Sequence, residues 1–439
     1  MASVIIISAL AFILMFISIL FNFKIKIFNI NLSAYWIITL IVALLMIVLK
    51  KVNIGDIYLI LLNDSIVNPL KIILLFFSMS FISIFLDKAG FFTLIAAKAI
   101  NRAKTSQFQI FSILYFTISI LTIFTSNDII ILTFTPFICY FCKNLNINPT
   151  PYLVSEFVAA NTLSMSLIIG NPTNIYLALN ANIDFISFFK EMFLLSLIIC
   201  IIAYFLMIMI FKKILSIKIE KQNVGYAINN KFYIIIGLIF LSISTILMAI
   251  SSYINIPMYL IAFACAFLLV IIVLFYKIIL KKHDHILLKS FKKIPYELFF
   301  FLLSMVVIIL ALNNCNVVFN ISTFLFNNES VFLIGLISFL MCSVMNNIPM
   351  SILFSNIFNC YSFSSKAIYS CIIASNIGAL FTPIGALAGI MFISIIKSFN
   401  INSFTFKTFF KYCMPISIIL LSASLLLLLI IWFLWHILY

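Results

Sequence analysis

Charged residues are scarce in this chain, and their scarcity excludes most soluble proteins. Asp, Glu, Lys and Arg make up 8% of the 439 residues, whereas 65% are hydrophobic. A soluble domain is about 25% charged and about half apolar, so the composition predicts an integral membrane protein. No polar region is long enough for a separate soluble domain. The first residues lack the basic segment of a cleavable signal, so the apolar run to Phe21 predicts a retained first helix.

Signatures of enzymes are also missing. Histidine occurs three times, at His283, His285 and His436, and never in an H-E-x-x-H sequence. The chain has no G-x-S-x-G sequence and no Walker A glycine–lysine loop. We therefore expect no catalytic residues, no cofactor, no resident metal and no enzymatic activity. His283-Asp284-His285 resembles a metal cluster, but its place in a basic segment favours a solvated loop.

The formal net charge of +15 does not indicate a nucleic-acid partner. The basic residues fall in short loops between apolar runs, where the positive-inside rule accounts for them. The loops Lys212–Lys231 and Lys277–Lys293 are the most basic, which places them in the cytoplasm of a cell-membrane, multi-pass protein. The nine cysteines are scattered through apolar runs and favour packing over disulfides.

Apolar runs predict an all-α polytopic membrane protein with about ten transmembrane spans. Two spans, near 151–186 and 366–396, are interrupted by polar residues. Two further stretches, 107–142 and 329–361, carry a polar turn at the middle and predict two re-entrant helical hairpins, although two short spans would fit each stretch as well. The eight uninterrupted spans lie near 3–21, 33–49, 70–86, 188–210, 232–251, 257–276, 296–313 and 413–437.

These segments recur in the same order in two halves. Residues 1–211 and 232–439 each contain three spans, a hairpin, an interrupted helix and a final span, and the basic cytoplasmic loop 212–231 separates them. Each half crosses the membrane an odd number of times, so the second half is inverted relative to the first. Two inverted repeats with interrupted helices are typical of secondary transporters, whose sites lie near the bilayer midplane.

Polar, helix-breaking patches supply the candidate substrate- and ion-binding residues. Lipid offers a broken backbone no hydrogen bonds, so such breaks are expected to line a cavity inside the protein. The first hairpin contributes Ser126, Asn127 and Asp128, and the second contributes Asn346 and Asn347. The interrupted helices contribute Asn171, Pro172, Thr173, Asn174, Asn376, Thr382 and Pro383.

The chemistry of these residues suits a small solute. A deep acid is usually paired, protonated or ion-binding, so Asp128 is the candidate for proton coupling, with a helix N-cap as the alternative role. Amides both donate and accept, and therefore suit a neutral polyhydroxy solute, an oxyanion or a sodium ion. The arms that follow the hairpin tips start a helix there, so their positive dipole ends face the site. Pro172 and Pro383 break their helices, and the freed carbonyls and the hydroxyls of Thr173 and Thr382 can then meet a solute or an ion.

The run Met345-Asn346-Asn347-Ile348-Pro349, followed by Thr382–Ala388, resembles the second-half signature of the arsenite/antimonite efflux permeases. Asn127-Asp128 and Pro136 are similar to that family's first-half elements. The resemblance extends from about residue 70 to 420. It implies membership of the ion-transporter superfamily, with the sodium/proton antiporters and the citrate and dicarboxylate carriers. It also implies a scaffold domain, a moving transport domain, and a site between two hairpin tips and two broken helices.

The chain departs from the arsenite pattern at two places, where Asn161-Thr162 and Ser375-Asn376 replace expected acids. We expect a secondary active transporter, with arsenite/antimonite efflux driven by protons or membrane potential as the leading interpretation. An anion or citrate-like carboxylate permease and a Na⁺/H⁺ antiporter are the alternatives, and a channel is disfavoured. The expected partners are a small inorganic solute, a coupling H⁺ or Na⁺ and the lipid bilayer, and the resemblance allows a homodimer and a separate ATPase subunit.

Overall fold

A computed structural model describes residues 2–21, 23–27, 30–62, 68–102, 106–219, 230–281 and 284–438. His283 and residues 220–229, half of the predicted loop 212–231, lie outside these residues. The first half contains α1 (Ala2–Leu20), β1 (Lys24–Ile27), β2 (Ile30–Ser33), α2 (Ala34–Val48), α3 (Ile54–Leu62), α4 (Pro69–Lys88), α5 (Phe91–Arg102), α6 (Gln107–Phe124), α7 (Asn127–Asn144), α8 (Thr150–Leu163), α9 (Pro172–Asn180) and α10 (Phe185–Leu215). The second half contains α11 (Lys231–Ala249), α12 (Ser251–Ile254), α13 (Met258–Ile279), α14 (Ile286–Phe291), α15 (Glu297–Asn314), α16 (Val317–Asn327), α17 (Val331–Met345), α18 (Asn347–Cys360), α19 (Ser365–Ile377), α20 (Leu387–Ser398) and α21 (Phe406–Leu438).

The contacts between the halves are reciprocal. Helix α2 packs against α15, and α13 packs against α4. Likewise α7 packs against α20, and α18 packs against α9. Each contact between the halves therefore recurs with the roles of the two halves exchanged. The boundary between the repeats stays a prediction, since residues 220–229 are not described.

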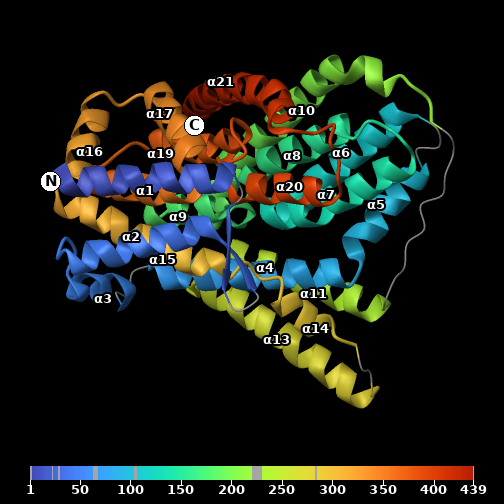
Figure 1. Cartoon of the computed structure of the whole chain (residues 1–439), viewed down its shortest axis with the longest axis horizontal. Coiled ribbons are helices and arrows are strands. Elements are labelled where there is room, and N and C mark those ends of the chain that lie inside the picture. The colour runs from blue at the N-terminus through green and yellow to red at the C-terminus, as the bar shows by residue number, and fades with distance from the viewer. Residues whose placement is uncertain are drawn as a thin grey trace.

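The helices form two groups (Figure 1). Helices α2, α4, α11, α13, α14 and α15 lie together in the lower part of the view, and the hairpins, interrupted helices, α10 and α21 lie above them. Helices α4 and α15 lie at the boundary, where α4 contacts α7 and α9, and α15 contacts α18. The two hairpins and the two interrupted helices thus belong to one helical group.

Eight helices in the described part of the chain are long and apolar enough to cross a bilayer, namely α1, α4, α6, α10, α11, α13, α15 and α21. Seven of them match uninterrupted spans predicted from the sequence. The predicted span 33–49 instead forms α2, which has only 15 residues and is about 22 Å long, shorter than a typical hydrocarbon core. Helix α6 belongs to the first hairpin, and its length allows it either to cross or to turn back.

A small β-hairpin is the exception to the predicted all-α fold. Strands β1 and β2 are antiparallel, with Lys24 opposite Ser33 and Ile27 opposite Ile30. The Ser33 hydroxyl donates to Glu297 Oε1 at 3.2 Å, and the Tyr35 hydroxyl donates to Glu297 Oε2 at 3.2 Å. Four-residue strands carry too little periodic signal to be recognised in a sequence. The Glu297 contacts tie the end of this hairpin to the start of α15.

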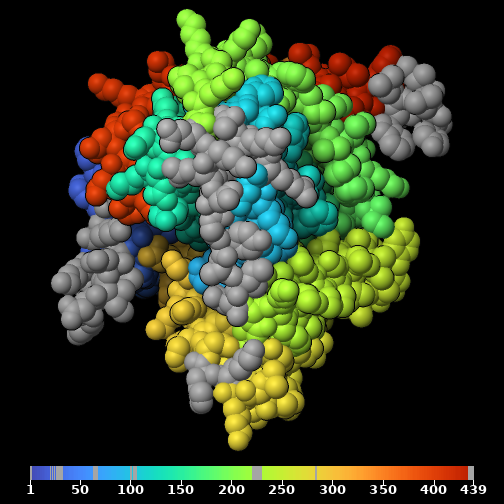
Figure 2. All heavy atoms as spheres, turned by 90° about the vertical axis from the view of Figure 1, so that its right-hand side faces the viewer, coloured from blue at the N-terminus to red at the C-terminus, as the bar shows by residue number. Residues whose placement is uncertain are grey.

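Large apolar side chains cover the outer helices, as expected for surfaces in contact with lipid. On α13, Phe267, Phe275 and Ile278 are 55–71% exposed, and on α10 Phe205 and Met209 are 58% and 76% exposed. Soluble monomers rarely expose such continuous apolar surfaces. In the side view, the yellow atoms of the α13 region project at the lower edge of the molecule (Figure 2). The chain is therefore a multi-pass membrane protein.

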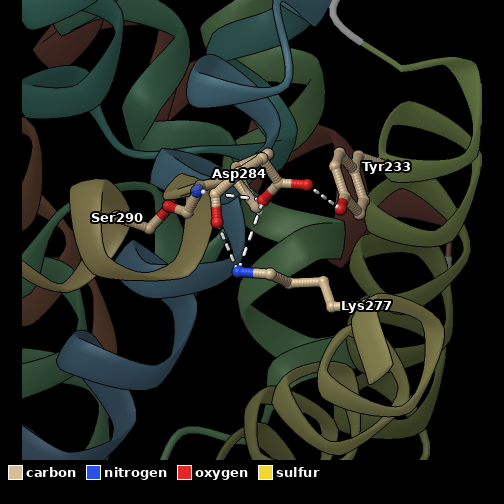
Figure 3. A network of polar contacts seen from close by, with 5 residues as sticks. Tyr233, Lys277, Asp284 and Ser290 are labelled. Atoms are coloured by element: carbon tan, nitrogen blue, oxygen red, sulfur yellow. Dashed lines mark hydrogen bonds and ion pairs between the residues drawn. The ribbon is translucent and has the colours of Figure 1, made fainter. Parts of the chain in front are cut away.

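A network of polar contacts surrounds Asp284, which precedes α14 (Figure 3). The Asp284 carboxylate accepts a hydrogen bond from the Tyr233 hydroxyl, and Lys277 Nζ lies 3.5 Å from Asp284 Oδ1. Burial tends to raise the pKa of Asp284. The Tyr233 hydroxyl, the Ile286 N–H and the Lys277 ammonium outweigh this effect and hold the pKa below its ordinary value. The ionised carboxylate therefore stabilises the folded segment.

We predict that Asp284→Asn destabilises the protein at neutral pH and not at low pH. Because the folded pKa is depressed, the stabilisation is present above the ordinary pKa of about 3.9 and is lost as pH falls through the folded value. The effect at pH 7 should stay below about 1 kcal/mol, since the carboxylate is partly exposed. Melting temperatures of the purified protein across pH measure it. Asp56→Asn, at a carboxyl with no side-chain partner in the described residues, is the control, and an equal loss at every pH would contradict the prediction.

Candidate functional site

The two hairpins turn at the predicted polar residues. Helix α6 ends at Phe124 and α7 begins at Asn127, while α17 ends at Met345 and α18 begins at Asn347. Ser126 has an ordinary extended backbone at the first tip. Asn346 at the second tip has φ 77° and ψ 152°, a conformation that side-chain-bearing residues rarely adopt. Its side chain compensates by accepting the Ile348 N–H at 3.2 Å, which caps α18.

The two interrupted helices break where the sequence predicted. Helix α8 ends at Leu163, passes through two single 3₁₀ turns, and resumes as α9 at Pro172. Proline at the first position of a helix loses no hydrogen bond, because that N–H would have no helical partner. Gly170 allows the backbone at the break to pass close to Ser164, since a Cβ at position 170 would lie 2.1 Å from the Ser164 carbonyl oxygen. Helix α19 ends at Ile377, and α20 begins at Leu387, after the irregular segment that contains Pro383.

Four helices that begin at the breaks pack in pairs. Helix α7 packs against α20, and α18 packs against α9. Helix N-termini carry unpaired N–H groups and partial positive charge. Asp128 lies in the first turn of α7, and the backbone N–H of Ala388, in the first turn of α20, faces its carboxyl group. This arrangement brings an acid and helix N-termini from both halves to one place.

Asn376 connects the two interrupted helices. Its Oδ1 accepts from Asn171 Nδ2 at 2.9 Å and from the Ser164 hydroxyl at 3.0 Å. Its Nδ2 donates to Asn174 Oδ1 at 2.7 Å. Next to it, the hydroxyls of Thr173 and Ser375 lie 3.0 Å apart. One amide near the end of α19 thus joins three polar residues of the first half.

This network continues to the first hairpin tip. The Ser164 hydroxyl also lies 3.1 Å from the Asn161 carbonyl oxygen, and Asn161 Oδ1 accepts from Asn127 Nδ2 at 3.1 Å. Asn127 in turn accepts the Asp128 N–H at 2.9 Å. Hydrogen bonds therefore run from Asp128 to Asn376 without leaving the protein interior.

The second tip is attached to the second interrupted helix. Asn346 Nδ2 donates to the Ile384 carbonyl at 2.8 Å, and the Asn347 N–H donates to the Gly385 carbonyl at 2.9 Å. The Thr382 hydroxyl donates to the Ser343 carbonyl at 2.7 Å. The freed carbonyls near Pro383 are thus paired with the hairpin tip, as broken backbone in a low-dielectric interior requires.

The candidate site is closed in this conformation. All of its predicted residues are buried. The amides of Asn127, Asn171, Asn174 and Asn376 bond to other side-chain amides, whereas that of Asn346 bonds to backbone groups. Two cavities of about 10 Å³ border the site, one beside Ser126 and one beside Pro383. The Ser126 hydroxyl lines the first of these and has no hydrogen-bond partner among the described residues. The sequence analysis expected a cavity at the breaks, and in this conformation only these two small cavities border the described site.

Sequence reasoning missed three residues that complete the network, namely Asn161, Ser164 and Ser375. A signal was present, because Ala160-Asn161 and Ser375-Asn376 stand at corresponding places near the ends of α8 and α19. Repetition of a small residue followed by asparagine in both halves could have identified Asn161. That the network binds a substrate or an ion stays a prediction.

The fold and this closed polar centre define a multi-pass membrane transporter. The model of the citrate transporter family CitMHS matches residues 14–359, most of the chain. The chain therefore belongs to this family of transporters.

Three curated relatives are similar to parts of the chain. "Putative transporter arsB" of Dictyostelium discoideum is 28% identical over 34% of this chain and 26% of its own length. "Uncharacterized transporter Rv2685" of Mycobacterium tuberculosis (strain ATCC 25618 / H37Rv) is 29% identical over 28% of each chain. "P protein" of Homo sapiens is 30% identical over 29% of this chain and 16% of its own. The aligned part therefore spans less than a third of each of these relatives.

Among solved structures, the YdaH transporter of Alcanivorax borkumensis has a similar fold. Its TM-score is 0.56 and its identity 11%, and the match covers 97% of both chains. That crystal structure is described as having an unusual topology. At this identity the likeness concerns the fold alone, and it supports the polytopic membrane architecture over the whole length of the chain.

We predict opposite orders of stability for glycine and alanine at the two hairpin tips. At Asn346 the backbone favours glycine, so Asn346→Gly should be more stable than Asn346→Ala by about 1–3 kcal/mol. At Ser126 the backbone is ordinary, so Ser126→Ala should be at least as stable as Ser126→Gly. Melting temperatures of the four purified variants test this prediction. Equal stability of both variants at 346 would show that the tip relaxes without strain.

Proposed function

We propose that this transporter exports arsenite and antimonite, driven by proton exchange or by the membrane potential. The observation that carries the proposal is the composition of the buried network. Its side-chain donors and acceptors are amides and hydroxyls, and none of their described hydrogen bonds comes from Lys or Arg. Arsenious acid is uncharged at neutral pH and presents hydroxyl groups that both donate and accept. Such a solute can replace amide–amide bonds without bringing a net charge into a low-dielectric interior.

Asp128 supports proton coupling because its carboxyl group and the solute would compete for the same backbone N–H, that of Ala388. The Ala388 N–H at the start of α20 faces the Asp128 carboxyl group, and an ionised carboxylate attracts it more strongly than a protonated carboxyl does. Protonation weakens this attraction and leaves the N–H available to an oxygen atom of the solute. Proton and solute would then occupy the site in a linked order, which is what coupled transport requires. Because α7 and α20 pack against each other, this exchange is local.

A citrate-like carboxylate is the second candidate substrate. Membership of the citrate transporter family and the four helix N-termini at the site favour an anion. The deep carboxyl of Asp128 and the uncharged amide and hydroxyl side chains are less suited to a multiply charged anion than to a neutral solute. The two candidates therefore differ in whether the site must accommodate net charge. A homodimer and a separate ATPase subunit stay predictions.

We predict that a bacterial host without its own arsenite exporter holds less arsenic after arsenite loading when it makes this protein. Asp128→Asn should remove at least about 90% of this effect, because one step of the coupled cycle is lost. Cellular arsenic is measured at equal membrane expression, with Asp56→Asn as the control. Unchanged arsenic in cells with the wild-type protein would contradict arsenite export. Uptake of labelled citrate by the same cells would then favour the second candidate.

A further inference from the structure

A second carboxyl group, Glu156, is enclosed in the protein away from the hairpin tips. It lies in the middle of α8 and is 0% exposed. The Thr135 hydroxyl of α7 donates to Glu156 Oε1 at 2.8 Å. The other oxygen, Oε2, is buried and has no hydrogen-bond partner among the residues that the structure describes. Buried polar atoms are rarely left without a partner, so this oxygen requires an explanation.

Among the described residues, none forms an ion pair with Glu156. Cys139 of α7 interacts with it electrostatically. Away from their ends, the helices packed against α8 carry thiols and phenols as titratable groups, including Tyr115 of α6, Cys142 of α7, Cys200 of α10, Cys371 of α19 and Cys413 of α21. Charged residues on these helices lie toward their ends, at Asp128 and Lys143 of α7, Lys190, Glu191, Lys212 and Lys213 of α10, Lys366 of α19, and Lys407 and Lys411 of α21.

An unpaired carboxylate in such a place would cost several kcal/mol, so the closed conformation requires a proton on Glu156. A permanently protonated carboxyl would still need an acceptor for its O–H, and the structure provides none at Oε2. The Thr135 hydroxyl can donate its hydrogen bond to the ionised or to the protonated carboxyl of Glu156. The site is therefore built to gain and lose a proton rather than to hold one hydrogen-bonded arrangement.

A cavity at one end of the helices lies beyond Tyr152, which is one helical turn from Glu156 on α8. This cavity of about 450 Å³ is lined by polar residues that include Gln107, Asn144 and Lys218. The Tyr152 hydroxyl donates to Gln107 Oε1 at 3.1 Å. Tyr152 precedes Glu156 by four residues on α8, so both lie on one face of the helix.

In the other direction, Thr135 follows Asp128 by seven residues, so it lies on the same face of α7, two turns away. Polar residues therefore recur along α7 and α8 between the cavity and the candidate site. The hydrogen bonds among them are those of Tyr152 to Gln107 and of Thr135 to Glu156. The lysines near the cavity, Lys212, Lys213 and Lys218, place it on the cytoplasmic side under the positive-inside rule.

We propose that Glu156 is a second proton-binding site, loaded from the cytoplasmic cavity and distinct from Asp128. The proton adds to the carboxylate and leaves it again, with no covalent change elsewhere. Its consequence for transport rests on the proposed function, because only a working transporter can be coupled through it. Proton binding itself does not depend on the identity of the solute.

Infrared difference spectroscopy of the purified full-length protein in lipid nanodiscs tests proton binding directly. Because Asp128 is a second buried carboxyl, the spectra are compared in the Asp128→Asn background. Between high and low pH, this protein should gain a band of a protonated carboxyl in an apolar environment. Adding Glu156→Gln, which keeps the size and the contact to Thr135, should remove this band, whereas adding Glu329→Gln, at an exposed carboxyl, should keep it. A band that persists when Glu156→Gln is added would overturn the proposal.

Two further variants keep the test decisive. If Glu156→Gln does not fold, Thr135→Val leaves the carboxyl in place and removes its one hydrogen bond, and the same band should move to a different frequency. An unmoved band in Thr135→Val would count against Glu156 as its source. In membrane vesicles, Glu156→Gln should lower arsenite transport driven by a pH gradient at least tenfold, while arsenite exchange without a gradient continues. If the wild-type protein moves no arsenite, the proposed function fails, and the infrared result still decides whether Glu156 binds a proton.

Discussion

The hydrogen bonds of amides and hydroxyls at the centre of this protein follow from the need to pair broken backbone in an interior without water. Both hairpins and both interrupted helices leave N–H and C=O groups without helical partners, and lipid cannot provide substitutes. The structure resolves this with asparagine, serine and threonine side chains, which cap the new helices and bond to freed carbonyls. The Asn346–Ile384 and Thr382–Ser343 bonds are direct examples. The polar residues that make the centre a candidate site are thus also what allows the helices to break there.

This dual role explains why the halves depend on each other. Asn376 of the second half completes the hydrogen bonding of Asn171 and Asn174 in the first. The reciprocal packing of α7 against α20 and of α18 against α9 brings the four helix starts together in pairs. A solute that replaced one amide partner would therefore affect both halves at once. Such a centre can couple binding to a change of conformation without a large cavity in the closed state.

Buried acids follow a different physical rule from the amides. An amide is satisfied by another amide, but a carboxyl buried among thiols and phenols must bind a proton or obtain a counter-charge. Asp128 faces the Ala388 N–H at the start of α20, whereas Glu156 has one hydroxyl and an oxygen without a partner among the described residues. The two acids have different surroundings, and for this reason we assign them separate roles in proton exchange.

The sequence by itself determined the membrane class, most of the spans, the positions of both hairpin turns and both helix breaks, because hydropathy and helix-breaking residues act locally. It also identified Asn127, Asn171 and Asn376 as candidates. Only the tertiary structure decided that these amides pair with one another, that Asn161 and Ser164 join them, and that Glu156 is fully enclosed. The short helix α2 and the β-hairpin likewise became visible only in the structure. Partners such as Asn376 and Asn171 are about 200 residues apart, and local patterns carry no information about which distant residue supplies a hydrogen bond.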